Sequence, residues 1–446
     1  MMRIQLDPIE TDSVLPAHAD VVVIGGGIIG TSCALALAEK GVSVVLCEKG
    51  AIGGEQSGRN WGWCRAMGRD PAELPLAIES LRLWRGMNAR VGAETGFRQA
   101  GTIYLADTQR ELAGHEAWLA HARRFQLDSR LLAADEIETV LPGARRRWAG
   151  ALHTPSDGRA EPGKASPAIA AAARRAGATV LTGCAVRGIE TAGGAVAAVV
   201  TEHGRIACNA AVLAGGAWSR LFCGNLDIDL PQLKVLSSVL RTTQVDGPET
   251  AAGASDFSFR KRLDGGYTVA RRNISISQIV PDSFRLFADF APALRTSWHE
   301  LRLRIGRSFI NEWRVPRRWQ LDSVTPFEQV RVLDPVPTRS LVDEGLANLR
   351  RAFPIFEGVQ IAGSWAGLID TTPDAVPVIG QLDALPGFFL ATGFSGHGFG
   401  IGPAAGQLTA DLVRGAAPLV DPRPFAPSRF ARLRRRIGTG QTATPP

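Results

Sequence analysis

The chain has 446 residues, too many for one compact core, so two domains are expected. Hydrophobic residues make up 45% of it and charged residues 21%, which is typical of a globular protein and excludes an intrinsically disordered one. Lysine and arginine outnumber aspartate and glutamate by 50 to 43, but the basic residues are scattered and are not gathered with aromatic residues on one element, so no nucleic-acid partner is expected.

The sequence also predicts where the protein acts. No apolar run is long enough to span a bilayer, and residues 1–20 lack the basic head and apolar core of a secretory signal. The six cysteines form no C-x-x-C pair, which indicates a reduced intracellular chain without a metal site. A cytoplasmic protein is expected, with membrane association at most peripheral.

The first predicted elements form a strand–helix–strand unit. Residues 19–24 are apolar apart from Asp20 and show no alternation, which is typical of the buried centre of a parallel sheet. Three glycines follow, and residues 28–40 have helical composition. Residues 42–47 predict a second buried strand, which Glu48 ends.

The rest of the chain alternates between two sequence patterns, each of which indicates a different domain. Alanine-rich helices and apolar strands indicate one domain, and alternating strands near 226–334 indicate an antiparallel sheet. Helices are predicted over residues 71–91, 162–177, 289–305 and 403–414. Strands are predicted over residues 101–105, 179–181, 185–191, 195–201, 210–213, 234–242, 266–270 and 387–393.

A G-x-G-x-x-G fingerprint lies between the first strand and the first helix. Gly25 permits a tight turn, Gly27 lets the backbone approach a pyrophosphate, and Gly30 lets the helix pack on the strand. The helix N-terminus offers free N–H groups and the positive end of its dipole. Glu48, twenty-one residues after Gly27, is placed to bond ribose hydroxyls.

These observations predict an α/β fold in which a discontinuous Rossmann-type dinucleotide domain carries an inserted antiparallel-sheet substrate domain of α+β type. The dinucleotide domain is expected over residues 1–95, 152–225 and 335–420. The substrate domain is expected over residues 96–151 and 226–334, and residues 421–446 are expected to form a surface tail.

Other glycine-rich segments favour FAD over NAD. Residues 53–63 follow the second strand, residues 214–219 close a third strand, and residues 393–400 open another helix. A second helix N-terminus aimed at a flavin ring would stabilise its anionic reduced form, whereas a nicotinamide enzyme gains nothing from such a site. FAD is therefore the predicted cofactor.

In their order along the chain, these segments resemble the motifs of the glycine oxidase, sarcosine oxidase and D-amino-acid oxidase/dehydrogenase family of FAD enzymes. The resemblance extends from Val21 to about Arg429. It rests on the fingerprint, residues 57–60, Val186, residues 215–219, residues 372–380 and residues 393–400.

Together, the fingerprint and the resemblance predict the cofactor site. Val186 is expected to reach the adenine side through its backbone, and residues 395–400 to wrap the pyrimidine end of the flavin. The cofactor-binding residues are expected to be Gly25, Gly27, Ile28, Ile29, Gly30, Glu48, Lys49, Ser57, Arg59, Asn60, Gly62, Trp63, Val186, Gly215, Trp218, Gly367, Leu368, Gly393, Ser395, Gly396, His397, Gly398, Phe399 and Gly400.

The chain departs from the sarcosine-type branch at three positions. The cysteine that bonds FAD covalently is matched near Gly367, which implies non-covalent FAD. The lysine that favours reaction with oxygen is matched by Gly400, and the active-site histidine is replaced near Arg272. The electron acceptor is therefore left open between oxygen and a quinone or carrier.

Four residues are candidates for contact with the substrate. Arg65 matches an arginine that binds the substrate carboxylate in the family, and a guanidinium offers a carboxylate a bidentate fork. Strand alternation lets only one of Arg271 and Arg272 point inward, and Arg272 is preferred. Tyr267 could contact substrate, and His397 could act as a general base or contact the flavin through its backbone.

The expected reaction is oxidation of the C–N bond of a small amine or amino acid, either a D-amino acid or an N-substituted one, by hydride transfer to flavin N5 to give an imine. One alternative is an FAD-dependent 2-hydroxy acid dehydrogenase, because the same scaffold hosts both chemistries. Another is a flavin-binding subunit of a hetero-oligomeric dehydrogenase. The sequence does not decide whether the protein forms a homo-oligomer or a hetero-complex.

Overall fold

The computed structural model describes residues 4–298, 301–430 and 433. Its first layer is a six-stranded sheet with the order β21-β22-β13-β1-β2-β9. Neighbouring strands are parallel except for β21, which is antiparallel to β22. The strands are β1 (Val21–Ile24), β2 (Val44–Cys47), β9 (Thr179–Leu181), β13 (Ala210–Leu213), β21 (Val378–Gln381) and β22 (Phe388–Thr392).

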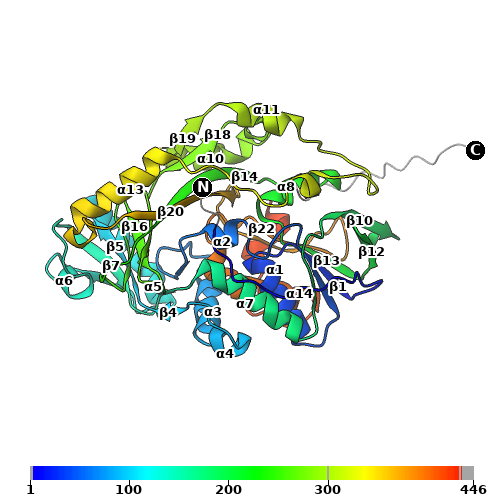
Figure 1. Cartoon of the computed structure of the whole chain (residues 1–446), viewed down its shortest axis with the longest axis horizontal. Helices are drawn as coiled ribbons and strands as arrows, with labels where there is room; N and C mark the ends of the chain where they lie inside the picture. Colours follow the sequence, from blue (N-terminus) through cyan, green and yellow to red (C-terminus); the bar gives the residue numbers. More distant parts are fainter. Residues whose placement is uncertain (1–3, 299–300, 431–432, 434–446) are drawn as a thin grey trace, which may run out of the picture.

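The central strand β1 is buried on both faces, which explains its continuous apolar sequence. Val21 and Val23 point into one core, and Val22 and Ile24 point into the other. The first core lies under four helices that Figure 1 shows gathered in the lower half of the molecule. They are α1 (Ile28–Ala38), α3 (Leu74–Arg85), α7 (Pro162–Arg175) and α14 (Gly398–Val413).

The second core lies between the same sheet and a small antiparallel sheet. Side chains of the small sheet and of α8 (Ser219–Asn225) complete this core. The small sheet consists of β10 (Val186–Ala192), β11 (Ala195–Thr201) and β12 (Gly204–Ala207).

The second layer is a ten-stranded, mostly antiparallel sheet with the order β19-β18-β14-β17-β16-β15-β5-β7-β6, in which β20 also pairs with β14. Figure 1 shows it spreading from the left of the molecule to the top. Its strands are β5 (Thr102–Ala106), β6 (Arg130–Leu132), β7 (Gly150–Thr154), β14 (Leu233–Thr242), β15 (Ala251–Gly253), β16 (Ser258–Lys261), β17 (Tyr267–Ala270), β18 (Ser275–Gln278), β19 (Leu301–Arg304) and β20 (Ile361–Thr371).

Helix α13 (Arg339–Ala352) covers one face of this sheet, and an aromatic cluster fills the space between them. None of the helices in the described ranges has both the length and the apolarity that crossing a bilayer requires. The remaining elements are α2 (Gln56–Arg59), β3 (Trp63–Cys64), α4 (Met87–Val91), β4 (Arg98–Gln99), α5 (Gln109–Arg124), α6 (Ile137–Val140), β8 (Gly158–Arg159), α9 (Pro281–Arg285), α10 (Phe287–Ser297), α11 (Arg307–Arg314) and α12 (Pro326–Gln329).

The expected mixed α/β class is confirmed, but three details of the sequence analysis are wrong. Residues 335–371, assigned to the dinucleotide domain, supply α13 and β20 to the large sheet, because β20 pairs with β14 along nearly its whole length. The helix expected over residues 289–305 ends at Ser297, and residues 301–304 form β19. Of the expected surface tail, Phe425 is 1% exposed and belongs to the first core, whereas residues 431–432 and 434–446 lie outside the described part.

Candidate active site

The G-x-G-x-x-G turn joins β1 to α1 at the carboxyl end of the six-stranded sheet. Gly25 has a φ of +111°, and a Cβ there would lie 2.5 Å from the carbonyl oxygen of Ala214. A Cβ at Gly30 would lie 1.9 Å from the Gly25 carbonyl oxygen. Side chains at these positions would force the turn away from its neighbours. The glycines therefore keep the N-terminus of α1 accessible. At this end of the helix, the Ile28 N–H donates a hydrogen bond to Ser57 Oγ at 2.8 Å.

The acidic end of β2 supports this turn. Each carboxylate oxygen of Glu48 accepts one backbone N–H at 2.7 Å, one from Gly26 and the other from Gly50. Burial raises the pKa of Glu48, although both hydrogen bonds favour the charged form. Next to it, the ammonium of Lys49 lies 4.5 Å from the centre of the Trp218 ring. Glu48 thus holds the glycine turn in place.

A buried polar network joins the other two glycine segments. Gln232 Nε2 donates to the Gly216 carbonyl at 3.2 Å, to Asp370 Oδ2 at 3.0 Å and to Thr392 Oγ1 at 3.1 Å. The same Asp370 oxygen accepts the Gly393 N–H at 2.8 Å. Burial raises the pKa of Asp370. The ends of β13, β20 and β22 are therefore fastened to one another.

One cavity of about 530 Å³ extends along these strand ends. Gly27, Gly215 and Gly398 all line it, so the three glycine segments converge on the same space. The expected cofactor residues that line it are Gly25, Gly27, Ile28, Ile29, Glu48, Lys49, Ser57, Arg59, Asn60, Trp63, Val186, Gly215, Trp218, Gly367, Gly396, His397, Gly398, Phe399 and Gly400. The expected cofactor residues that do not line the cavity are Gly30, Gly62, Leu368, Gly393 and Ser395.

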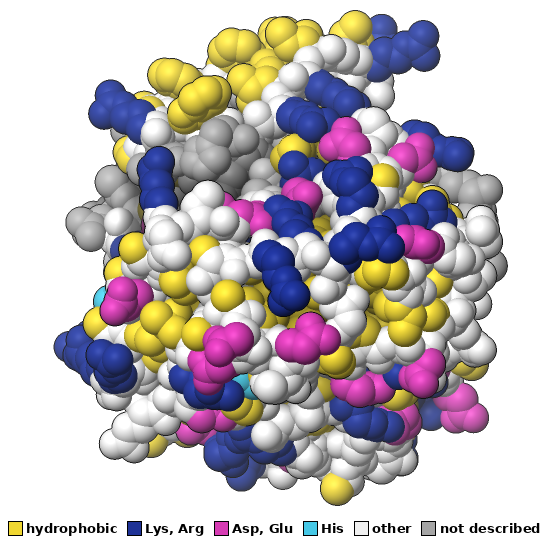
Figure 2. All heavy atoms as spheres, turned by 90° about the vertical axis from the view of Figure 1, so that its left-hand side faces the viewer, with side chains coloured by type: hydrophobic (Ala, Val, Ile, Leu, Met, Phe, Trp, Pro, Cys, Tyr) yellow, Lys and Arg dark blue, Asp and Glu magenta, His cyan; other side chains and the backbone are white. Residues whose placement is uncertain are grey.

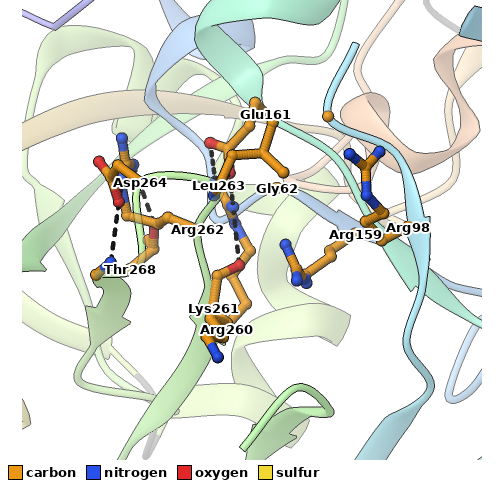
Figure 3. A network of polar contacts seen from close by, with 12 residues as sticks. Gly62, Arg98, Arg159, Glu161, Arg260, Lys261, Arg262, Leu263, Asp264 and Thr268 are labelled. Carbon is orange, nitrogen blue, oxygen red and sulfur yellow. Dashed lines mark hydrogen bonds and ion pairs between the residues drawn. The ribbon is translucent and has the colours of Figure 1, made fainter. Parts of the chain in front are cut away.

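Gly62 lies behind the wall because an arginine of the large sheet packs against it. A Cβ at Gly62 would lie 2.5 Å from Arg260 Nε, which donates to the Trp61 carbonyl. Arg260 is 1% exposed and forms a two-point ion pair with Glu161, at 2.7 and 3.0 Å, as Figure 3 shows. Asn60 Oδ1 accepts the Gly62 N–H at 2.7 Å. The loop 60–63 is therefore fixed from both sides, which favours a preformed cofactor site.

At the other end of the cavity, two arginines meet one aromatic ring. The guanidinium of Arg272 lies 3.8 Å from the centre of the Tyr104 ring, and that of Arg65 lies 5.3 Å from it. Trp61 and Trp63 stand beside them, with ring centres 5.4 Å apart in an edge-to-face arrangement. All five side chains line the cavity. This end combines positive charge with aromatic walls, which suits an anion that carries an apolar group.

Tyr267 does not reach the cavity, contrary to expectation. Tyr267 begins β17, and its side chain is fully buried in the aromatic cluster. Its ring centre lies 4.8 Å from that of Phe356. Its hydroxyl donates to the Pro248 carbonyl at 3.0 Å, and burial raises its pKa. Tyr104, the other tyrosine, takes the position beside Arg272. Strand alternation showed that one face of each strand is buried, but not which face turns to the cavity.

His397 stands at the start of α14 in contact with a buried carboxylate. Its Nδ1 lies 3.0 Å from Glu73 Oε2, and Glu73 is fully buried. Burial and the nearby Arg69 lower the pKa of His397 to about 4, in spite of Glu73. The imidazole is therefore neutral at pH 7, with Nδ1–H as the donor to the carboxylate. This arrangement orients the ring.

This pair predicts a stability change on acidification. An unperturbed histidine has a pKa of 6.5, and the folded value is about 4, so the unfolded chain takes up a proton at higher pH than the folded one. The free energy of unfolding should therefore fall as the pH drops from 6.5 to about 4. Thermal unfolding between pH 7 and pH 4.5 measures this fall, and His397→Asn should flatten it. An identical pH dependence in the variant would contradict the assignment.

The residues of the cavity fit a bound flavin dinucleotide. The open N-termini of α1 and α14 offer backbone N–H groups for the pyrophosphate and for flavin oxygens. Buried donors without a hydrogen-bond partner in the described part of the chain also line the space, namely Nε and Nη1 of Arg69 and Nε1 of Trp63. Such donors are rare unless a ligand or water satisfies them. Arg69 and Tyr104 therefore join the functional candidates, and Tyr104 was not expected from the sequence.

Comparison with known proteins agrees with this geometry. Residues 20–412 match the family described as DAO, FAD dependent oxidoreductase. A glycine oxidase of Pseudomonas putida is 26% identical over 416 residues, covering 91% of this chain and 98% of that protein. A mitochondrial sarcosine dehydrogenase of Mus musculus is 25% identical over 430 residues, but the match covers only 42% of that longer protein.

Solved structures give a higher likeness. The L-amino acid deaminase of Proteus myxofaciens, determined in complex with anthranilate, is 37% identical with a TM-score of 0.92, covering 96% of this chain and 97% of that one. The L-amino acid deaminase of Proteus vulgaris is 32% identical with a TM-score of 0.90, covering 95% of this chain and 100% of that one. The cofactor expected from the glycine segments, FAD, is confirmed by the family match. The chain belongs to the DAO family of FAD-dependent oxidoreductases.

Proposed function

We propose that the protein oxidises the Cα–N bond of an L-α-amino acid with an aromatic or other large apolar side chain. The product would be an imino acid, which water hydrolyses to a 2-oxo acid and ammonium. The observation that carries this proposal is the pairing of Arg272 with Tyr104 and Trp61 at one end of the cavity. At this end, the guanidinium of Arg272 can bind the carboxylate of the substrate, and the rings of Tyr104 and Trp61 can pack against its apolar side chain.

The L configuration is proposed from relatives. Two L-amino acid deaminases share 37% and 32% of their residues with this chain and cover nearly all of it. The anthranilate bound to one of them is an aromatic ring that carries a carboxylate and an amine. A ligand of that kind matches the charge and the walls around Arg272. The D-amino acids and N-substituted amino acids expected from the sequence are therefore second choices.

The bound flavin would supply the hydride acceptor, and the chain would supply position and charge. Arg272 would hold the substrate carboxylate so that the Cα–H bond has one orientation. The second guanidinium, Arg65, would lower the pKa of the substrate ammonium and so favour the neutral amine that can react. No base among the described residues is required for this step, and His397 is assigned an orienting role through Glu73.

A second finding bears on the electron acceptor. Gly400, which stands where some relatives have a lysine, packs so closely on β3 that a Cβ would lie 2.8 Å from the Trp63 carbonyl oxygen. A lysine at this position would displace the loop beside the cavity. This close contact favours an acceptor other than oxygen, such as a quinone or a carrier. FAD is proposed to be non-covalent, because Gly367 lines the cavity without a nucleophilic side chain.

Anaerobic mixing with a panel of substrates tests the proposal. We expect L-phenylalanine and L-leucine to bleach the bound flavin within seconds to minutes, while their D-isomers, sarcosine and the matching 2-hydroxy acids leave it oxidised. The 2-oxo acid should appear in a one-to-one ratio with reduced flavin. Reduction by a 2-hydroxy acid alone would support the alcohol-oxidising alternative. If a substrate reduced the flavin only when a co-purified partner protein was present, the result would support a flavin-binding subunit of a hetero-oligomeric dehydrogenase.

A further inference from the structure

The guanidinium of Arg272 reaches Tyr104 across the large sheet. Arg272 follows β17, whereas Tyr104 belongs to β5, and β16 and β15 lie between these two strands. We propose that Gly253, in β15, is a positioning residue, because it provides the space in which the guanidinium of Arg272 is held for the substrate carboxylate. This inference rests on the proposed function, in which Arg272 binds that carboxylate.

A row of small residues crosses the sheet between the two strands. Ala270 of β17 pairs with Ser258 of β16. Ser258 in turn pairs with Gly253 of β15, and Gly253 pairs with Tyr104 of β5. Residues that lie directly opposite each other in a sheet project from the same face. In this row, therefore, no large side chain stands between the end of β17 and the ring of Tyr104.

The row lies on the face of the sheet that is turned toward the cavity. Ala252, which precedes Gly253, belongs to the aromatic cluster under α13. Ala251 belongs to a different cluster, together with Tyr104 and Trp63, which both line the cavity. Because side chains alternate along a strand, position 253 shares the face of Ala251. A side chain at position 253 would therefore project toward the substrate end of the cavity.

The guanidinium of Arg272 takes the space that such a side chain would need. A Cβ added to Gly253 would lie 2.7 Å from Arg272 Nη1 and 3.2 Å from Arg272 Cζ. The guanidinium also lies 3.8 Å from the centre of the Tyr104 ring, and its Nη1 donates to the Ala254 carbonyl at 3.4 Å. A glycine inside a strand is typical of a place where another group approaches closely. The ring, the glycine and the carbonyl together define the position of the guanidinium.

Arginines on the outer surface have different surroundings. Figure 2 looks at the molecule from the side where Figure 1 places α6, β5 and β7, and it shows basic and acidic side chains interspersed. Arg145, for example, is exposed and lies 3.1 Å from Glu357. Arg272 lies against the ring of Tyr104 and the backbone of Gly253, so packing contributes to its position. A change in that packing surface is expected to move the guanidinium.

An alanine at position 253 would move the guanidinium and leave the strand intact. Gly253 does not have a positive φ, so its backbone accepts an alanine. The atom nearest to the added Cβ is the end of a flexible side chain, Arg272, which gives way more easily than the sheet does. The next neighbour is Cη2 of Trp63, at 3.2 Å. The substitution therefore changes the position of the guanidinium without removing its charge.

Titration of the flavin-loaded protein with anthranilate, followed by flavin absorbance, tests the proposal in a double-mutant cycle. We expect Gly253→Ala to raise the Kd of anthranilate about tenfold or more, because a displaced guanidinium loses the geometry of a two-point contact. In the Arg272→Met background, the same substitution should change the Kd by less than about twofold. The KM of an amino acid substrate should rise with the Kd, whereas the KM of its amide should not.

Controls separate positioning from a loss of structure. Gly224→Ala, in α8, should bind anthranilate like the parent, because an added Cβ there meets nothing within 4 Å. Circular dichroism and FAD content show whether each variant is folded. If Gly253→Ala is not folded, Tyr104→Leu provides a second test, since it removes the ring beside the guanidinium without adding atoms. Tyr104→Leu should weaken binding more in the parent than in the Arg272→Met background.

The possible results separate this inference from the proposed function. Parent-like binding of anthranilate by Gly253→Ala would overturn the inference and leave the proposed function intact. An equal loss in the Arg272→Met background would also overturn the inference, because the substitution would then act through Trp63. The same two readings apply to Tyr104→Leu. Parent-like binding by Arg272→Met alone would contradict the proposed function, and the inference with it.

Discussion

Replacement of Gly27 by valine is expected to give a folded protein without FAD. Gly27 has φ −74° and ψ 178°, a conformation that valine adopts without strain. The nearest atom to an added Cβ is Ser57 Oγ at 3.0 Å, which lies beside the accessible N-terminus of α1. The branched side chain would occupy the space where a pyrophosphate approaches the N–H groups. The affinity for FAD should fall by at least about 10³, or roughly 4 kcal/mol.

The loss of FAD is measured by the absorbance of purified protein and by titration of the stripped protein with FAD. Far-ultraviolet circular dichroism shows whether the variant is folded. Gly114→Ala provides the control, because Gly114 lies in α5 and an added Cβ there meets nothing within 4 Å. It should keep its FAD and gain a little helix stability. A yellow Gly27→Val protein with unchanged affinity would show that the pyrophosphate lies elsewhere.

Replacement of Arg272 by methionine should have the largest effect on catalysis. Its guanidinium lies in the cavity, 3.8 Å from the centre of the Tyr104 ring, and a bound carboxylate would receive two charge-assisted hydrogen bonds from it. Removing such a group costs about 3 to 4 kcal/mol, a fall of roughly 10² to 10³ in kcat/KM. Methionine keeps much of the side-chain volume, so the cavity wall stays in place.

Two comparisons give this prediction its specificity. Arg272→Lys retains the charge but not the planar fork, and it should recover only part of the activity. Arg271→Met is the matched control, because Arg271 also lines the cavity but its guanidinium donates to the Ser255 carbonyl at 3.1 Å and lies 3.7 Å from Glu344. The loss at position 272 should be small for an amino acid amide, which has no carboxylate. Equal losses for the acid and the amide would contradict carboxylate binding by Arg272.

The sequence was informative where function depends on consecutive residues. The glycine turn, the strands on either side of it and Glu48 all follow from local spacing within one strand–helix–strand unit, in which Gly30 packs on Gly25 and Glu48 accepts the Gly26 N–H. The segments around Gly215 and Gly398 were identified in the same way, as glycines that follow a strand. Their convergence on one cavity results from the parallel order of the strands.

The substrate end was harder to predict because it depends on pairing between distant strands. Tyr104 meets Arg272 only because β5 joins β17 through β15 and β16 in the large sheet. Periodicity gives the two faces of a strand but not the neighbour on each face, so Tyr267 was chosen and Tyr104 was missed. The membership of β20 was misjudged for the same reason, since its partner β14 lies more than one hundred residues earlier.

The surface side chains of α9, β19 and α11 illustrate a different limit. Phe284, Leu303 and Trp313 have the composition of core residues until their exposure is known. The same residue types can fill a core or lie on the surface, and only the tertiary structure distinguishes the two.

A crystal structure with FAD and an unreactive aromatic carboxylate such as anthranilate tests the central claim most directly. We expect the pyrophosphate at the N-terminus of α1 beside Gly27, the flavin between Gly215 and Gly398, and the carboxylate on Arg272. A flavin outside this cavity, or a carboxylate bound elsewhere while Arg272 keeps its position on Tyr104, would contradict the account.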